Sequence, residues 1–138
     1  MHFFALGTPN LVALLLLIAT SAAANPVGVW FSTGQPHDPE MITRDQFNAD
    51  GTFRFEHRKY RDCELVYRAV EEGHWAQDGN ILTTDIESIN GAPVSYSHRY
   101  RYEAKDENEM HLYHFELDYL YVERRDENFQ SRDCWAGA

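Results

Sequence analysis

The segment Thr52–Tyr60 reads TFRFEHRKY, and the alternation of its side chains decides the fold class. Phe53, Phe55 and His57 fall on one face of an extended chain, while arginine and glutamate side chains fall on the other. Successive side chains of a β-strand point to opposite faces, so the pattern predicts a strand with one buried and one solvated face. Antiparallel sheets commonly have this arrangement.

Segments of the same kind recur along the chain and are separated by turn signals such as NADG (48–51), QDGN (77–80), NGAP (90–93) and KDEN (105–108). Asn-Gly and Asp-Gly pairs between alternating segments are typical of hairpins, which place neighbouring strands antiparallel. Eight strands are predicted: Val27–Ser32, Met41–Phe47, Thr52–Tyr60, Glu64–Ala76, Ile81–Ser88, Val94–Glu103, Glu109–Phe115 and Tyr119–Arg125. The sequence therefore predicts an all-β, single-domain, antiparallel up-and-down barrel of eight strands.

Residues 1–24 are interpreted as a signal peptide. Leu11–Ile18 is an apolar run, and the small residues after it end in Ala22-Ala23-Ala24, which is an A-x-A cleavage pattern. The apolar run is shorter than the roughly 20 residues of a membrane-spanning helix. We expect residues 25–138 to form the barrel domain of an exported protein, periplasmic or extracellular, with no membrane span after cleavage.

The net charge excludes some classes of partner, and the two cysteines predict a disulfide. The formal net charge of −10 repels phosphate backbones and anionic lipid surfaces, so we expect neither nucleic acid nor a membrane surface as a partner. The chain has two cysteines, Cys63 and Cys134. An even pair in an exported domain predicts a disulfide.

Several short motifs resemble those of lipocalin-like (calycin) barrels of the small bacterial exported type. Gly28-Val29-Trp30 resembles the G-x-W motif that opens the first strand of that family. FNADGTF (47–53) and GHWAQDG (73–79) are also similar to bacterial lipocalin-like domains, and Leu117-Asp118-Tyr119 matches the family's T-D-Y motif in part. The chain departs from the family in being shorter than typical lipocalins and in having no clear helix after the barrel.

The resemblance implies roles for individual residues. Trp30, next to Gly28, would close one end of the barrel, and a basic residue of the last strand, Arg124 or Arg125, would pack over its ring. A Cys63–Cys134 disulfide would tie the C-terminal tail to the barrel wall. Residues 33–40 (TGQPHDPE) would form a loop over the open end.

An aromatic and histidine face is the candidate ligand site. Its members are Phe53, Phe55, His57, Tyr67, Tyr96, His98, Tyr100 and Tyr102. If this face encloses a cavity, the apolar walls and hydrogen-bonding tips suit a small apolar or amphipathic molecule. The same side chains would also serve to fill a small barrel, and the sequence leaves both interpretations open.

A protein-interaction barrel and a metal-binding barrel are the alternative functions, and catalysis is not expected. A protein-interaction barrel, such as an inhibitor or assembly factor, would use a filled core and a working loop. A metal-binding barrel would use histidines such as His57 with His98, or His114 with Glu116 and Asp118, but no compact zinc spacing is present and no metal ligand is assigned. No nucleophile elbow, phosphate loop or dinucleotide motif occurs, so no enzyme, catalytic residue or cofactor is expected.

Overall fold

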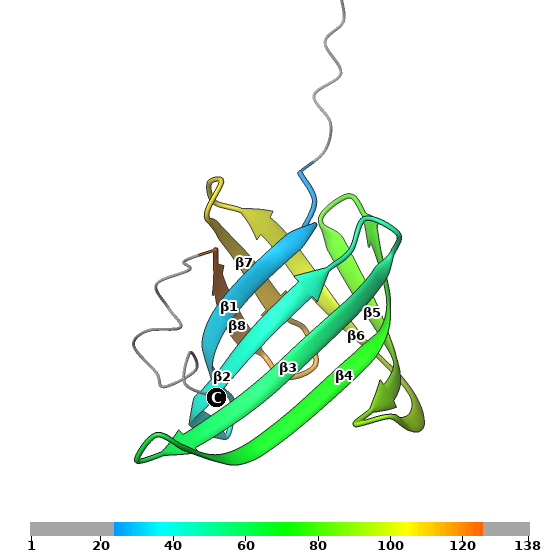
Figure 1. Ribbon diagram of the computed structural model, residues 1–138. Coiled ribbons are helices and arrows are strands. Elements are labelled where there is room, and N and C mark those ends of the chain that lie inside the picture. Colours follow the sequence, from blue (N-terminus) through cyan, green and yellow to red (C-terminus); the bar gives the residue numbers. More distant parts are fainter. Residues whose placement is uncertain (1–23, 126–138) are drawn as a thin grey trace, which may run out of the picture.

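The computed structural model describes residues 24–125 and shows a closed barrel of eight antiparallel strands (Figure 1). The strands are β1 (Gly28–Gln35), β2 (Asp38–Phe47), β3 (Thr52–Arg61), β4 (Glu64–Asp78), β5 (Ile81–Ile89), β6 (Ala92–Ala104), β7 (Glu109–His114) and β8 (Tyr119–Arg124). Each strand pairs with the next one in sequence, and β8 pairs with β1 to close the barrel. The predicted all-β, up-and-down, eight-stranded barrel is confirmed.

The connection between β1 and β2 differs from the expectation. Residues 33–40 do not form a loop over the open end, because β1 continues to Gln35, which pairs with Asp38 across a two-residue turn. Gly34 has a φ of 90°, and the register shifts between Thr33 and Gln35. Residues 39–41 of β2 stand opposite Gly34 alone, so the irregularity places two extra residues on β2 and lets both strands keep pairing.

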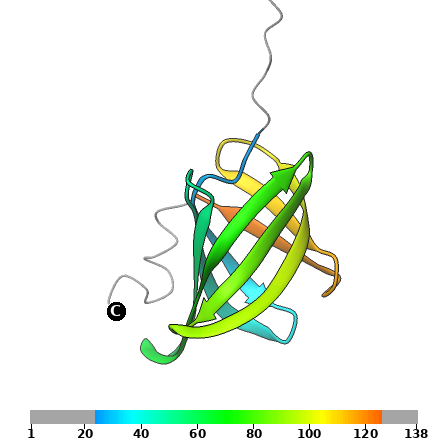
Figure 2. The ribbon, with the colours of Figure 1, turned by 90° about the vertical axis from the view of Figure 1, so that its right-hand side faces the viewer.

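Neighbouring strands run in opposite directions, so their turns alternate between two ends of the barrel (Figure 2). We call the end that holds the start of β1 and the β2–β3, β4–β5 and β6–β7 turns the closed end. The other end, with the β1–β2, β3–β4, β5–β6 and β7–β8 turns, is called the open end.

Trp30 plugs the closed end. Its side chain is 2% exposed and packs in a cluster with Phe47, Phe53, Tyr102 and Met110. The indole Nε1 donates a hydrogen bond of 2.7 Å to the carbonyl oxygen of Pro26, so the one polar atom of the ring is satisfied where it is buried. This is the role that the lipocalin resemblance implies for Trp30.

Of the two basic residues suggested for this role, Arg125 covers Trp30 and Arg124 does not. The Arg125 guanidinium carbon lies 4.1 Å from the centre of the Trp30 ring, and its Nη2 donates to the Val27 carbonyl oxygen at 3.1 Å. Arg124 instead donates from Nε to Glu109 Oε1 at 3.1 Å on the outer surface. Alternation along β8 explains the difference, because Tyr121 and Glu123 point inward and Arg125 follows the same parity.

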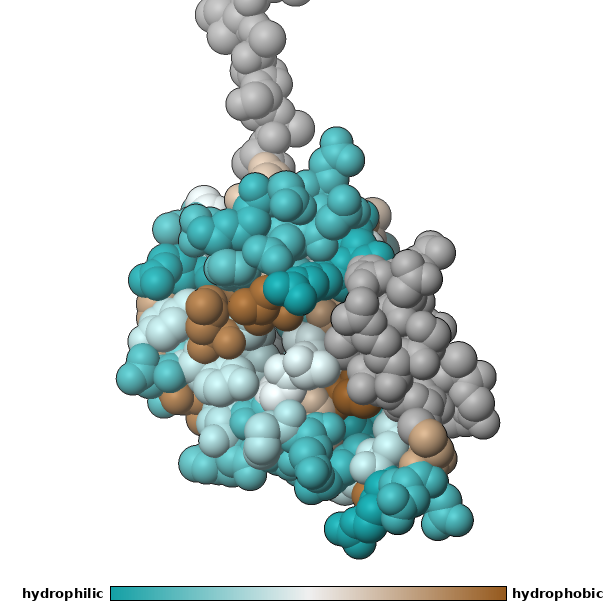
Figure 3. Space-filling view, turned by 90° about the vertical axis from the view of Figure 1, so that its left-hand side faces the viewer, coloured by the Kyte–Doolittle hydropathy of each residue, from teal (hydrophilic) through white to brown (hydrophobic). Residues whose placement is uncertain are grey.

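Hydrophilic residues cover most of the outer wall seen in Figure 3, with smaller hydrophobic patches among them. On the outer face of β3, Glu56 forms ion pairs with Arg54, Arg58 and Arg68 at 3.1, 2.8 and 2.7 Å. Burial alone would raise the pKa of Glu56, but the hydrogen bonds and charges of the arginines outweigh it and lower that pKa to about 2. The alternate face of this strand is therefore charged, as the sequence predicted.

Two expectations concern residues outside the part that the structure describes. Residues 1–23 hold nearly all of the predicted signal peptide, and Cys134 is the predicted partner of Cys63. The signal peptide and the Cys63–Cys134 disulfide stay predictions.

Candidate functional site

A cavity of about 240 Å³ occupies the half of the barrel nearer the open end. It reaches solvent there, because the lining residues Tyr67 and Leu117 are about half exposed. The lining comes from seven strands and the β7–β8 turn: Ser32, Gln35, Met41, Thr43, Asp45, Phe55, His57, Tyr67, Glu71, His98, Tyr100, Leu112, His114, Leu117, Tyr121 and Glu123. The barrel is thus filled at one end and hollow at the other.

The structure brings together five of the eight predicted ligand-lining residues. These five are Phe55, His57, Tyr67, His98 and Tyr100. Phe53 and Tyr102 are instead buried in the packed core. Tyr96 stands outside the lining, with 37% of its surface exposed, and its hydroxyl donates to Glu71 Oε1 at 3.2 Å. The predicted aromatic and histidine face therefore contributes both to the cavity wall and to the packed core, because its residues lie at different positions along the barrel axis.

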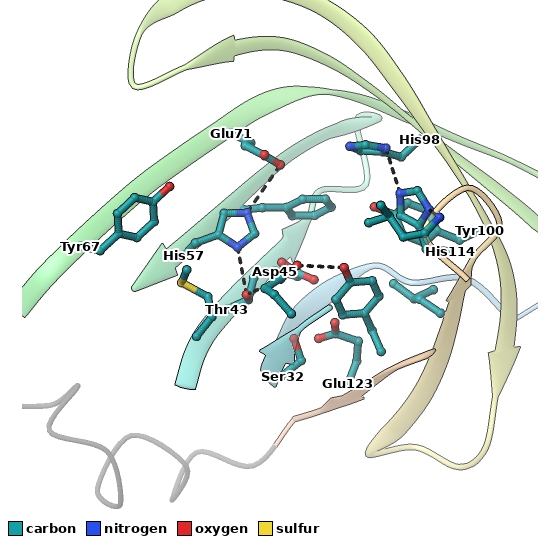
Figure 4. Close-up of a pocket in the computed structure, with 16 residues that line it drawn as sticks. Ser32, Thr43, Asp45, His57, Tyr67, Glu71, His98, Tyr100, His114 and Glu123 are labelled. Carbon is teal, nitrogen blue, oxygen red and sulfur yellow. Dashed lines mark hydrogen bonds and ion pairs between the residues drawn. The ribbon is translucent and has the colours of Figure 1, made fainter. Parts of the chain in front are cut away.

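His57 connects two strands across the cavity wall (Figure 4). Its Nδ1 lies 3.0 Å from Thr43 Oγ1 on β2, and its Nε2 lies 3.5 Å from Glu71 Oε2 on β4. Burial would lower the pKa of His57, but the hydrogen bond and charge of Glu71 outweigh it and raise that pKa. Protonated His57 donates from both ring nitrogens and forms an ion pair with Glu71.

The hydrogen-bonded chain continues beyond Thr43. Gln35 Nε2 donates to Thr43 Oγ1 at 3.4 Å, and Tyr121 donates from its hydroxyl to Gln35 Oε1 at 2.9 Å. The chain runs from β8 through β1, β2 and β3 to Glu71 on β4. Five strands are tied together around the cavity, and this fixes the orientation of its polar groups.

A second histidine pair forms another part of the wall. The backbone N–H of Leu117 donates to His114 Nδ1 at 3.2 Å, so that nitrogen carries no proton. His114 Nε2 lies 2.9 Å from His98 Nδ1 and is therefore the donor between the two rings. Burial, followed by repulsion from His98, lowers the pKa of His114 and favours this neutral form.

Two carboxyl groups lie buried deep in the cavity. Asp45 on β2 is 6% exposed and Glu123 on β8 is 1% exposed, and both lie close to Ser32 on β1 (Figure 4). Burial, together with the charge of Glu123, raises the pKa of Asp45 well above its ordinary value. Burial also raises the pKa of Glu123 to about 7. The pair therefore holds a proton far above the pH at which surface carboxyl groups lose theirs.

The sequence does not assign Asp45, Glu71, His114 or Glu123 to the ligand site, and it suggests His114 only as a metal ligand. A signal for three of them was present in the alternation. Asp45 shares the inward parity of Met41, Thr43 and Phe47, Glu123 shares that of Tyr121, and His114 shares that of Leu112. A carboxylate at an inward position of a strand is unusual, because burying a charge is costly. Such a residue is a candidate for function.

The histidines do not form the metal arrangements considered from the sequence. His57 and His98 bond to different partners, and residues 115–118 turn, so that Glu116 and Asp118 do not continue the strand of His114. Among residues 24–125, no group of three or more His, Cys, Asp or Glu side chains is placed to hold a metal ion.

No protein-family model matches the chain. No curated protein matches it either. In the part of the chain that is described, no helix has the length and apolar character needed to span a membrane.

Proposed function

We propose that this chain is an exported lipocalin-like barrel that binds a compact amphipathic molecule in its cavity. One observation carries the proposal: a cavity that reaches solvent lies directly above a tightly packed closed end. Small-molecule sites are concave and combine apolar walls with a few fixed polar groups. At about 240 Å³ the cavity is below the roughly 300 Å³ at which typical sites begin, so it suits a compact ligand.

The lining supports an amphipathic ligand. Phe55, Tyr100 and Leu112 offer apolar contact area, while His57 and Glu71 are held in place by the hydrogen-bonded chain. Polar groups that are already oriented lose little freedom when a ligand binds, and this favours affinity and selectivity.

A binding role is proposed over catalysis, although Thr43, His57 and Glu71 resemble a hydroxyl–base–acid series. Thr43 is 2% exposed and its hydroxyl lies between His57 and Gln35. A nucleophile must reach the substrate, and acyl transfer also needs donors for the developing oxyanion. Thr43 lies within a paired strand of the wall and is enclosed by its neighbours.

Native mass spectrometry of protein purified from the exported fraction tests the proposal. We expect a small organic mass that co-purifies with the protein and disappears after organic extraction, whereas chelation leaves it in place. An adduct of metal mass lost on chelation would contradict the proposal and favour the histidines as metal ligands.

A cavity-filling substitution sharpens the test. Ser32→Leu places an apolar side chain inside the cavity and should abolish the organic adduct. Ser95→Leu adds the same side chain at an exposed position and should keep it. If both variants retain the adduct equally, the molecule binds somewhere other than the cavity.

A protein partner is the second candidate, and exposed apolar side chains at the open end favour it. Leu65, Val66 and Tyr67 near the β3–β4 turn and Phe115 and Leu117 in the β7–β8 turn are each between 38% and 49% exposed. Large exposed apolar side chains near one another are typical of interaction surfaces. A clean apo mass in every preparation, together with a co-purifying protein, would favour this function over ligand binding.

A further inference from the structure

We propose that Asp45 and Glu123 form a recognition site for the ammonium group of a compact aromatic amine. This inference rests on the proposed function and specifies the chemistry of the ligand. It assigns a positive head group to the depth of the cavity and an apolar body to the part nearer the open end.

The geometry of the carboxyl pair carries the inference. Asp45 Oδ1, Glu123 Oε2 and Ser32 Oγ are all buried, and within residues 24–125 the three atoms have no hydrogen-bond partner beyond one another. All three atoms can accept hydrogen bonds, and their residues come from three different strands that line one cavity. Buried polar atoms are nearly always paired in native proteins. Two carboxyl groups and one hydroxyl have more acceptor positions than donors, so the cluster indicates a further donor that is supplied from outside.

The charge of the cavity selects a cationic donor. Three carboxyl groups line it (Asp45, Glu71 and Glu123), and among the described residues none of those that line it is a lysine or arginine. Protonated His57 on β3 is engaged by Glu71 on β4. The charge of His57 lowers the pKa of Asp45 without outweighing burial, and no positive group among the described residues acts on Glu123. A buried carboxylate is stable when it is paired with a cation.

The walls around the pair favour an organic cation over a metal ion. Tyr100 on β6 and Tyr121 on β8 line the same cavity as Asp45, and their ring centres are 6.5 Å apart. Tyrosine faces attract ammonium groups, and a ring of the ligand can pack against Phe55. A primary ammonium has three donors, one for each of Asp45, Glu123 and Ser32 in the cavity.

Binding of an ammonium is expected to release a proton. The empty site holds a proton because burial raises the pKa of both Asp45 and Glu123. The titratable neighbours of the pair are His57, Glu71, Tyr100 and Tyr121. A bound cation stabilises the carboxylates and lowers their pKa, so the affinity should rise with pH across the range in which the empty pair is protonated.

Three probes of similar shape and different charge test the inference by isothermal titration calorimetry. The probes are 2-phenylethylamine, which is a cation at neutral pH, 2-phenylethanol, which is neutral, and phenylacetate, which is an anion. We expect the amine to bind at least about tenfold more tightly than the alcohol, and phenylacetate to bind weakest. Titrating the amine in phosphate and in Tris at pH 7 should show proton release, and the affinity should fall up to about tenfold per pH unit below the pKa of the pair.

Two variants and a matched control locate the effect. Asp45→Asn and Glu123→Gln should each weaken amine binding by roughly 30-fold or more, because each removes a buried charge partner. Glu107→Gln removes one negative charge at an exposed turn and should leave the affinity unchanged. Proton release by the unaltered protein does not depend on the variants and tests the inference even where a variant fails to fold.

The outcomes separate this inference from the proposed function. If the alcohol binds as tightly as the amine, or amine binding releases no proton, the acid pair is not an ammonium site, although the cavity still binds ligands. If no probe binds at millimolar concentration, the ammonium site is contradicted, while the organic adduct in native mass spectrometry decides the binding function separately.

Discussion

The two ends of the barrel have the same strands and the same alternation, yet their interiors have opposite properties. At the closed end, Trp30 and its aromatic neighbours fill the space, and the buried indole nitrogen has its hydrogen-bond partner. At the open end, Asp45 and Glu123 are buried beside a cavity, and among the described residues their unpaired oxygens have no partner beyond the acid pair and Ser32. The closed end has the features of a stabilising core, whereas the open end retains features that cost stability and are typical of binding sites.

The largest expected effect comes from Trp30→Ala. The substitution removes the plug of the closed end, and loss of a buried tryptophan costs about 3–5 kcal/mol of the free energy of unfolding. Urea denaturation followed by circular dichroism measures it. A loss below about 1 kcal/mol would mean that the closed end is not the stabilising half of the barrel.

The acid pair should make the protein less stable as the pH rises from about 4.5 to about 7. Glu123 keeps its proton in the folded state up to a pKa of about 7, whereas the unfolded chain releases it near 4.5, so the folded state loses stability across this window. The expected loss is on the order of 3 kcal/mol. Glu56 acts in the opposite direction and below this window, since its lowered pKa removes stability as the pH falls from about 4.5 towards 2.

Glu123→Gln provides the control for this pH dependence. Urea denaturation at pH 5, 6 and 7 should give a flatter profile for this variant and a higher stability at pH 7. The raised pKa of His57 contributes a loss of stability only above its ordinary value of 6.5 and remains in both proteins. If the unaltered protein and Glu123→Gln show the same pH dependence of the free energy of unfolding, burial of Glu123 does not destabilise the open end.

Gly73→Ala tests how closely the strands pack beside Phe53. An added Cβ would lie 1.9 Å from the Asp85 carbonyl oxygen and 3.1 Å from Phe53 Cε1, so backbone must move. Overpacking of this kind typically costs about 1–3 kcal/mol. Gly79→Ala is the matched control, because its φ is 59° and nothing lies within 4 Å of the added atom. It should cost about 1 kcal/mol through conformation alone, and thermal melting of both variants compares the two.

The smallest effect distinguishes two adjacent arginines. Arg125→Ala removes the cation over Trp30 and the hydrogen bond to Val27, and should cost about 1 kcal/mol. Arg124→Ala removes an exposed ion pair with Glu109 and should stay within about 0.5 kcal/mol. If Arg124→Ala costs more stability than Arg125→Ala, the contact between Arg125 and Trp30 does not stabilise the closed end.

The fold and part of the site could be predicted because they depend on local patterns. Alternation identified all eight strands and placed Phe55, His57, His98 and Tyr100 on inward faces. The position along the barrel axis could not be obtained in this way, so Phe53 in the core and Phe55 at the cavity looked equivalent. The acid pair was missed because Asp45 and Glu123 come from strands far apart in sequence.

The sequence by itself determined the class of this protein, since the period of two and the turn residues specify antiparallel hairpins in order along the chain. Tertiary structure decided which inward side chains fill space and which line a cavity. Closure of β8 against β1 places Glu123 near Ser32 and Asp45, a proximity that no local pattern encodes. The physical reason is that burial and charge coupling depend on all strands that surround a residue, whereas alternation depends only on the residue's own strand.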